Sequence, residues 1–177
     1  MIDRDDRTMK MFSTALEMEE KGKAFYEKAK STCQNKLGRQ IFRMLMEEEI
    51  VHIDRIKTIY ESLKGAQAWS DEWKAMKIEH KGLRRVFREM ALTHGKNIKT
   101  ETSDLEALDI GIDLELRSIA FYEKQSGRAT DPKEKEFITQ MIGEERTHHT
   151  TLADMKYYLT DPASWFIESE RAGLDGA

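Results

Sequence analysis

The segment Glu145-Arg146-Thr147-His148 places a carboxylate and an imidazole at helix positions where apolar side chains are expected. At alternating steps of three and four, the surrounding seam reads Ile138, Met141, Glu145, His148, Leu152, Met155 and Leu159. Such a heptad seam is the stripe by which one helix packs against others. Charged side chains are almost never fully buried unless they are paired. The seam therefore predicts a compensating charge, and a metal ion bound by Glu-x-x-His supplies one.

The same break in the seam occurs once more, ninety-six residues earlier (145 − 49 and 148 − 52 both give 96). That seam reads Phe42, Leu45, Glu49, His52, Ile56, Ile59 and Leu63. The offset also aligns Glu19–Lys28 with Glu115–Lys124, and Glu, Ala, Phe, Tyr, Glu and Lys are identical between these segments. The chain is therefore a duplication of a two-helix unit. Each unit carries one lone seam glutamate, Glu19 or Glu115, and one Glu-x-x-His.

The composition limits the class of protein. The length of 177 residues suits one domain, and 35% charged with 39% hydrophobic residues favours long helices with solvated faces. Because the formal net charge is −4, we do not expect the protein to bind nucleic acid. The single cysteine, Cys33, excludes a disulfide framework and a CxxC metal knuckle. Because Met1–Asp6 is not typical of a signal peptide and no apolar run reaches membrane length, we expect a cytoplasmic protein without a membrane partner.

Start and stop signals divide the chain into four long helices. The first is expected from about Thr8 to Thr32, and the second ends near Lys64, before Gly65. The third opens with a capping-box pattern at Ser103-Asp104-Leu105-Glu106, and the fourth with another at Asp131-Pro132-Lys133-Glu134. These helices predict an all-α four-helix bundle over residues 1–160. Its long crossover, residues 65–103, should contain short helices, and residues 161–177 form a C-terminal tail that can dock on the bundle.

Folding the two units together brings six polar seam residues to the middle of the bundle. They are Glu19, Glu49, His52, Glu115, Glu145 and His148. One Glu from each of two helices and one Glu-x-x-His from each of the others is the ligand set of di-iron and di-manganese bundles. Two divalent cations would offset the four glutamates. Oxygen-rich ligation with one imidazole per metal predicts two iron ions, with manganese or zinc as alternatives.

Further residues follow from spacing relative to these ligands. Tyr26 and Tyr122 come seven residues after the lone glutamates and can hydrogen-bond a ligand carboxylate, or serve as plain core tyrosines. Glu48 and Glu144 can orient an imidazole of the opposite unit, or lie on a solvated face. His149 is an alternative ligand in the second unit, although the heptad favours the histidine before it.

Several segments of the sequence resemble the rubrerythrin-like branch of the ferritin-like di-iron superfamily. The resemblance rests on Leu16–Gly22 with Phe25-Tyr26, and on Glu48–His52 with its partner Glu144–His148; it extends over about Thr8–Leu159. It implies a non-haem di-iron centre that reacts with hydrogen peroxide or dioxygen, often in oxidative-stress defence.

Two departures from the family pattern qualify what the resemblance implies. Rubrerythrins carry a rubredoxin domain with cysteine-ligated iron, which one cysteine cannot build, so electrons are expected from a separate donor protein. They also carry an additional glutamate about one turn after the position of Glu115, where this chain has Ser118. The ligand set is thereby closer to the plainer, symmetric one of bacterioferritin.

Three functions remain open at this point. The first is an oxidoreductase that reduces hydrogen peroxide. The second is a ferroxidase or iron-handling protein that uses dioxygen. The third is a non-enzymatic metal-binding bundle, in which the region of Trp69 and Trp73 would be a contact patch. A homodimer is expected from the habit of such bundles.

Overall fold

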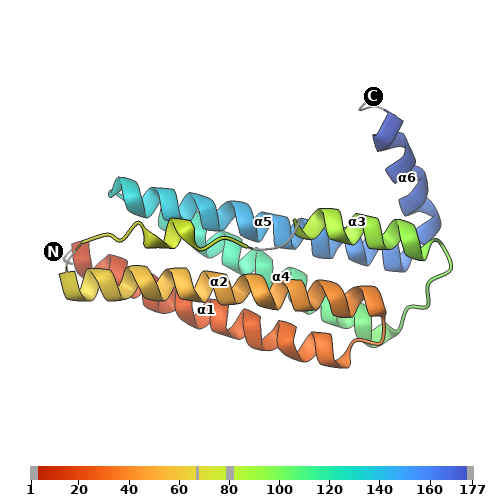
Figure 1. Cartoon of the computed structure of the whole chain (residues 1–177), viewed down its shortest axis with the longest axis horizontal. Coiled ribbons are helices and arrows are strands. Elements are labelled where there is room, and N and C mark those ends of the chain that lie inside the picture. Colours follow the sequence, from red (N-terminus) through yellow and green to blue (C-terminus); the bar gives the residue numbers. More distant parts are fainter. Residues whose placement is uncertain (1–3, 67, 79–81, 175–177) are drawn as a thin grey trace.

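Four long helices, packed side by side, form the body of the molecule (Figure 1). In the computed structural model, which describes residues 4–66, 68–78 and 82–174, they are α1 (Arg4–Thr32), α2 (Lys36–Ala66), α4 (Thr102–Ser126) and α5 (Pro132–Thr160). The helix α1 packs chiefly on α2, and α4 chiefly on α5, so each sequence repeat forms one antiparallel pair. The predicted all-α bundle with one long crossover is confirmed. The first helix begins about one turn earlier than the expected Thr8.

The capping box predicted for the third long helix is wrong. The helix α4 begins at Thr102 after Glu101, and the side chain of Glu101 makes no capping hydrogen bond. The buried carboxylate of Asp104 instead accepts hydrogen bonds from the backbone amides of Gln34 (3.1 Å) and Asn35 (3.2 Å). Asp104 therefore holds the tight connection between α1 and α2, because two amide donors there would otherwise lack partners.

The start of α5 follows the prediction at its cap and departs from it one turn later. Asp131 accepts a hydrogen bond from the backbone amide of Lys133 (2.8 Å), and Pro132 occupies the first helical position. Glu134 does not complete the box. Its carboxylate is 1% exposed and accepts from Arg7 Nη2 at 2.6 and 2.7 Å, which ties α5 to α1.

The crossover contains the expected short helices, a 3-10 turn η1 (Glu72–Ala75) and α3 (Leu83–His94). Trp73 is buried and its ring contacts Phe137 edge-on, with ring centroids 5.4 Å apart. Trp69 contacts Phe12 at 5.6 Å. Trp73 therefore belongs to the core of the bundle, whereas Trp69 is half-buried, and the contact patch considered for this region stays a prediction.

The tail forms a sixth helix, α6 (Pro162–Leu174), that projects away from the bundle (Figure 1). It docks through Trp165, which is 2% exposed, packs against Tyr158 and Phe87, and donates from Nε1 to Asp154 (2.8 Å). Residues 1–3 and 175–177, which form the two termini of the predicted domains, lie outside the described residues.

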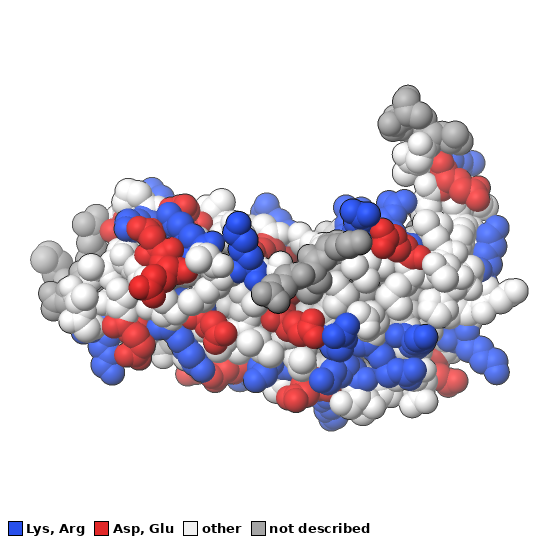
Figure 2. Space-filling view, in the orientation of Figure 1, with Lys and Arg blue, Asp and Glu red and all other residues white. Residues whose placement is uncertain are grey.

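Acidic and basic side chains are interspersed over much of the face shown in Figure 2, and several basic side chains gather at its lower right. Within the described residues, no helix combines the length and the apolar character needed to cross a membrane.

Candidate metal centre

The structure brings all six predicted ligand residues together inside the bundle. Glu19 comes from α1, Glu49 and His52 from α2, Glu115 from α4, and Glu145 and His148 from α5. None is more than 3% exposed. The heptad seams explain this convergence, because each seam faces the bundle axis and all six residues lie at about the same height along it.

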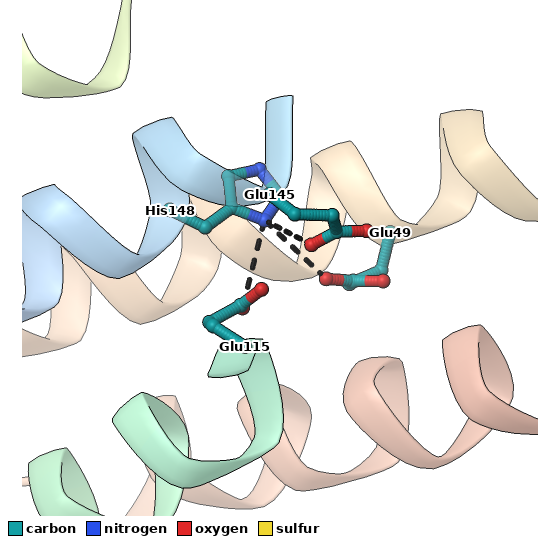
Figure 3. Close-up of side chains that lie close together, drawn as sticks. All are labelled: Glu49, Glu115, Glu145 and His148. Carbon is teal, nitrogen blue, oxygen red and sulfur yellow. Dashed lines mark ion pairs between the residues drawn. The ribbon is translucent and has the colours of Figure 1, made fainter. Parts of the chain in front are cut away.

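The six residues form two overlapping groups that can each hold a metal ion. One consists of Glu49, Glu115, Glu145 and His148, whose carboxylates gather around one imidazole in Figure 3. The other consists of Glu19, Glu49 and His52. Within each group the potential ligand atoms all lie within 4.8 Å of one another. Glu49 belongs to both groups, so its carboxylate could be shared between two ions.

The nitrogen that His148 turns to the carboxylates makes no hydrogen bond to any described residue. His148 Nδ1 lies 3.4 Å from Glu145, 3.5 Å from Glu115 and 3.6 Å from Glu49. Glu145 Oε1 is likewise buried and without a hydrogen-bond partner among the described residues. Leaving buried polar atoms unsatisfied costs ~1–3 kcal/mol each. A bound cation would satisfy both atoms, so the donor set fits a metal ion.

His52 presents the same nitrogen to the second group. Its Nδ1 lies 3.3 Å from Glu19, 3.4 Å from Glu145 and 3.8 Å from Glu49. The two imidazole rings are nearly parallel, with centroids 5.5 Å apart. Each ring therefore offers one nitrogen to one side of a shared carboxylate cluster, an arrangement suited to two ions with one histidine each.

The outer nitrogen of each imidazole is held by a glutamate from the opposite helix pair. His52 Nε2 lies 2.9 Å from Glu144, and His148 Nε2 lies 2.7 Å from Glu48. A carboxylate on the outer nitrogen makes that nitrogen the N–H, which leaves Nδ1 free to bind a metal. Of the two alternatives considered for Glu48 and Glu144, the structure shows contact with an imidazole of the opposite unit.

Two tyrosines support the lone glutamates across the bundle. Tyr122 donates to Glu19 at 2.5 Å, and Tyr26 donates to Glu115. Burial, and then the nearby carboxylates, raise the pKa of both phenols well above the usual range. The phenols therefore stay protonated and act as hydrogen-bond donors.

Burial and neighbouring charges shift the pKa values of the carboxylates in this cluster. Burial, followed by repulsion from Glu145, raises the pKa of Glu115 to about 8. Burial, with Glu19 and Glu145 nearby, also raises the pKa of Glu49 well above its usual range. Burial also acts to raise the pKa of Glu145, but the imidazoles of His148 and His52 hold that pKa well below its usual range. The metal-free cluster therefore retains protons that two cations would displace.

A scan against protein-family models matches the rubrerythrin model over residues 10–156. The chain belongs to the rubrerythrin family. No rubredoxin domain is detected in it. The rubrerythrin family binds a di-iron centre, which the buried glutamate and histidine groups described above fit. No curated protein and no solved structure gave a significant match.

Sequence reasoning missed one residue of this rubrerythrin site, Arg55. It is 4% exposed, and its Nη1 donates to Glu144 at 2.5 Å, while Nε and Nη2 donate to the carbonyl of Met76 at 3.0 and 2.7 Å. Burial opposes ionisation of Glu144, but His52 and Arg55 lower its pKa to about 2. The only signal for Arg55 was its position three residues after His52. The alternative ligand, His149, belongs to neither metal-binding group.

A pocket of about 250 Å³ opens between α1 and α4 and reaches the carboxylates. Its ten lining residues form five pairs related by the sequence repeat: Met18 and Leu114, Glu19 and Glu115, Lys21 and Arg117, Gly22 and Ser118, Glu49 and Glu145. Neither of the clustered histidines lines it. Small molecules can therefore approach the carboxylate side of the cluster along the internal pseudo-twofold axis.

Proposed function

We propose that the six clustered residues bind two iron ions and that the protein reduces hydrogen peroxide, with electrons from a separate donor protein. The α1/α4 pocket supports this proposal most directly, because it joins solvent to the carboxylates of a two-metal donor set. Four glutamates offset the four positive charges of two divalent ions, and the donor atoms are those that iron favours. A cytoplasmic homodimer remains part of the prediction.

The rim of the pocket favours peroxide over ferrous ions as the species that enters. Lys21 lines the pocket and is exposed, whereas Arg117, which also lines it, is paired with Asp113 at 2.7 Å. The charge of Lys21 at the entrance repels a dication and leaves the approach of a neutral molecule unaffected. A ferroxidase that takes up iron as cargo through this pocket is therefore the second choice.

When bound, two ferrous ions supply one electron each, which is what reduction of one hydrogen peroxide and two protons to two waters requires. The residues of the chain prepare this reaction by position. Glu48 and Glu144 hold the imidazoles by their outer nitrogens, and the hydroxyls of Tyr26 and Tyr122 hold the lone glutamates. The open pocket admits peroxide and protons from solvent.

The test starts from metal-free protein loaded anaerobically with Fe(II) and mixed rapidly with hydrogen peroxide or dioxygen, with oxidation followed optically. We expect two irons per chain and oxidation much faster with peroxide. Equal or faster oxidation by dioxygen that continues beyond two irons would replace this proposal with ferroxidase activity. Oxidation by neither would leave a non-enzymatic metal-binding bundle.

The same loading experiment tests the ligands. Glu49→Ala and His148→Ala should each reduce iron binding, whereas His149→Ala, on the adjacent residue outside both groups, is the matched control and should load normally. Unchanged loading of the first two variants would refute the ligand assignment.

A further inference from the structure

We infer that the α1/α4 pocket accepts alkyl hydroperoxides, with the alkyl group held between Met18 and Leu114 and the peroxide end toward the carboxylates. This inference rests on the proposed function, because it names a second substrate class for the same site. Four observations carry it: the size of the pocket, its two small wall residues, its apolar walls and the charge balance of its rim.

The volume exceeds what hydrogen peroxide needs. The pocket measures about 250 Å³. Liquid water occupies ~30 Å³ per molecule, and a peroxide with two oxygens takes up roughly twice that, so most of the pocket is left over. Sites for drug-sized ligands begin at ~300 Å³, which confines the occupant to a small molecule.

Two small residues create this space directly beside the ligand carboxylates. Gly22 and Ser118 each lie three residues after a lone glutamate, on facing helices. A Cβ atom at position 22 would lie 3.4 Å from the Glu49 carboxyl group, so a longer side chain there would cover that carboxylate. Ser118 is 8% exposed and stands where the family resemblance implies a further glutamate. The pocket is therefore open where a longer residue would fill it.

The walls and the rim favour a neutral, partly apolar occupant. Met18 and Leu114 both line the pocket and occupy equivalent positions of the sequence repeat. At the rim, Arg117 pairs with Asp113 at 2.7 Å, so its charge is already balanced and a carboxylate on the substrate is not required. A short alkyl group gains from contact with the two apolar side chains, whereas hydrogen peroxide has no group to place there.

The reaction is the reduction of ROOH to ROH. The O–O bond breaks, the distal oxygen leaves as water, and the alkoxy oxygen takes a proton. Two protons come from solvent through the pocket. Two iron ions held by the six ligand residues would supply the two electrons, and the separate donor protein of the proposed function would replace them.

Binding is tested without turnover on the zinc-loaded protein, since zinc undergoes no redox change. The probe is tert-butyl alcohol, the product of tert-butyl hydroperoxide, titrated against protein labelled on its methionine methyl groups. We expect a saturable NMR shift at Met18 and none at Met155, a core methionine outside the pocket. Ser118→Leu should abolish the shift, whereas Ser103→Leu, the same substitution on an exposed residue of α4, should retain it.

Kinetics of the iron-loaded protein give the second readout. Ser118→Leu should lower the ratio of kcat/KM for tert-butyl hydroperoxide to kcat/KM for hydrogen peroxide by about tenfold or more, the scale of discrimination in a filled apolar pocket. Ser103→Leu should leave both values unchanged. Met18→Trp narrows the pocket from the other wall and replaces Ser118→Leu if that variant does not fold.

The inference would be overturned if no saturable shift appeared at Met18. It would also be overturned if the folded variants lost kcat/KM equally for both peroxides. Failure of hydrogen peroxide reduction in the unmodified protein would instead overturn the proposed function, and the zinc-protein titration would still report on the pocket.

Discussion

Raising the pH from 5 to 7 should destabilise the metal-free protein, because the folded cluster holds protons that the unfolded chain releases. Glu115 has an ordinary pKa of 4.5, and burial, with repulsion from Glu145, raises it to about 8. A folded pKa above the unfolded value gives stability that is full below pH 4.5 and is lost as the pH rises toward 8. For Glu115 alone the loss between pH 5 and pH 7 is ~2.5 kcal/mol.

The other shifted groups do not reverse this sign. The pKa of Glu49 is raised by burial and neighbouring carboxylates. Burial acts to lower the pKa of His52 and His148, but the surrounding glutamates raise both well above the usual range. The contribution of each of these three groups to the stability of the folded protein therefore decreases as the pH rises. Glu144 and Glu145 have lowered pKa values and are ionised in both states above about pH 5, so they add little slope.

The assay is urea unfolding of chelator-treated protein, followed by circular dichroism at pH 5, 6 and 7. Glu115→Gln is the matched control, because the amide keeps the shape of the side chain and cannot ionise. Between pH 5 and pH 7, the free energy of unfolding of this variant should fall by ~2.5 kcal/mol less than that of the unmodified protein. Stability that rises with pH in the unmodified protein, or the full slope retained in Glu115→Gln, would refute the reasoning.

Three further predictions use the same protein. Loading of the metal-free protein with Zn(II) at pH 7, in weak buffer with an indicator dye, should release protons. The Glu115→Gln variant should release about one proton fewer per chain. Equal release from both proteins would contradict protonation of Glu115. Tyr122→Phe loses the 2.5 Å hydrogen bond to Glu19 and should lower the free energy of unfolding by ~1–3 kcal/mol, and unchanged stability in urea would show that the bond contributes nothing. Gly38→Ala places a Cβ 2.6 Å from Cys33 Sγ and should cost ~1–3 kcal/mol, with less cost in a Cys33→Ala background; the same cost in both backgrounds would exclude this clash.

Local signals in the sequence predicted the helices well where the relevant contact is local, and poorly where it is not. Asp131 caps its own helix because its partner is two residues away. The segments 103–106 and 131–134 have the spacing of capping boxes, but the carboxylates of Asp104 and Glu134 within them bind other segments. Spacing along one helix does not show which distant donor, such as Arg7, lies nearer, so tertiary contacts override the local pattern.

The ligand residues could be predicted because burying charge leaves a trace in the seam. An apolar heptad interrupted by Glu and His at the same two places in both repeats has few explanations other than a shared polar centre. Arg55 left no such trace. Its partners, Glu144 and the Met76 carbonyl, lie on another helix and in the crossover, and the path of the crossover is not encoded in the repeat.

The duplication explains both what the two halves share and where they differ. Ligands, phenols and pocket walls come in pairs because a pseudo-twofold axis passes through the centre. Differences between paired positions therefore mark what is specific to one side. In the pocket, Gly22 corresponds to Ser118. Arg55 corresponds to Thr151, whose hydroxyl donates to the Thr147 carbonyl at 2.8 Å. The link from the crossover through Arg55 to Glu144 thus has no copy at position 151. Substitutions at these unequal positions, rather than at the paired ligands, should separate the behaviour of the two halves of the site.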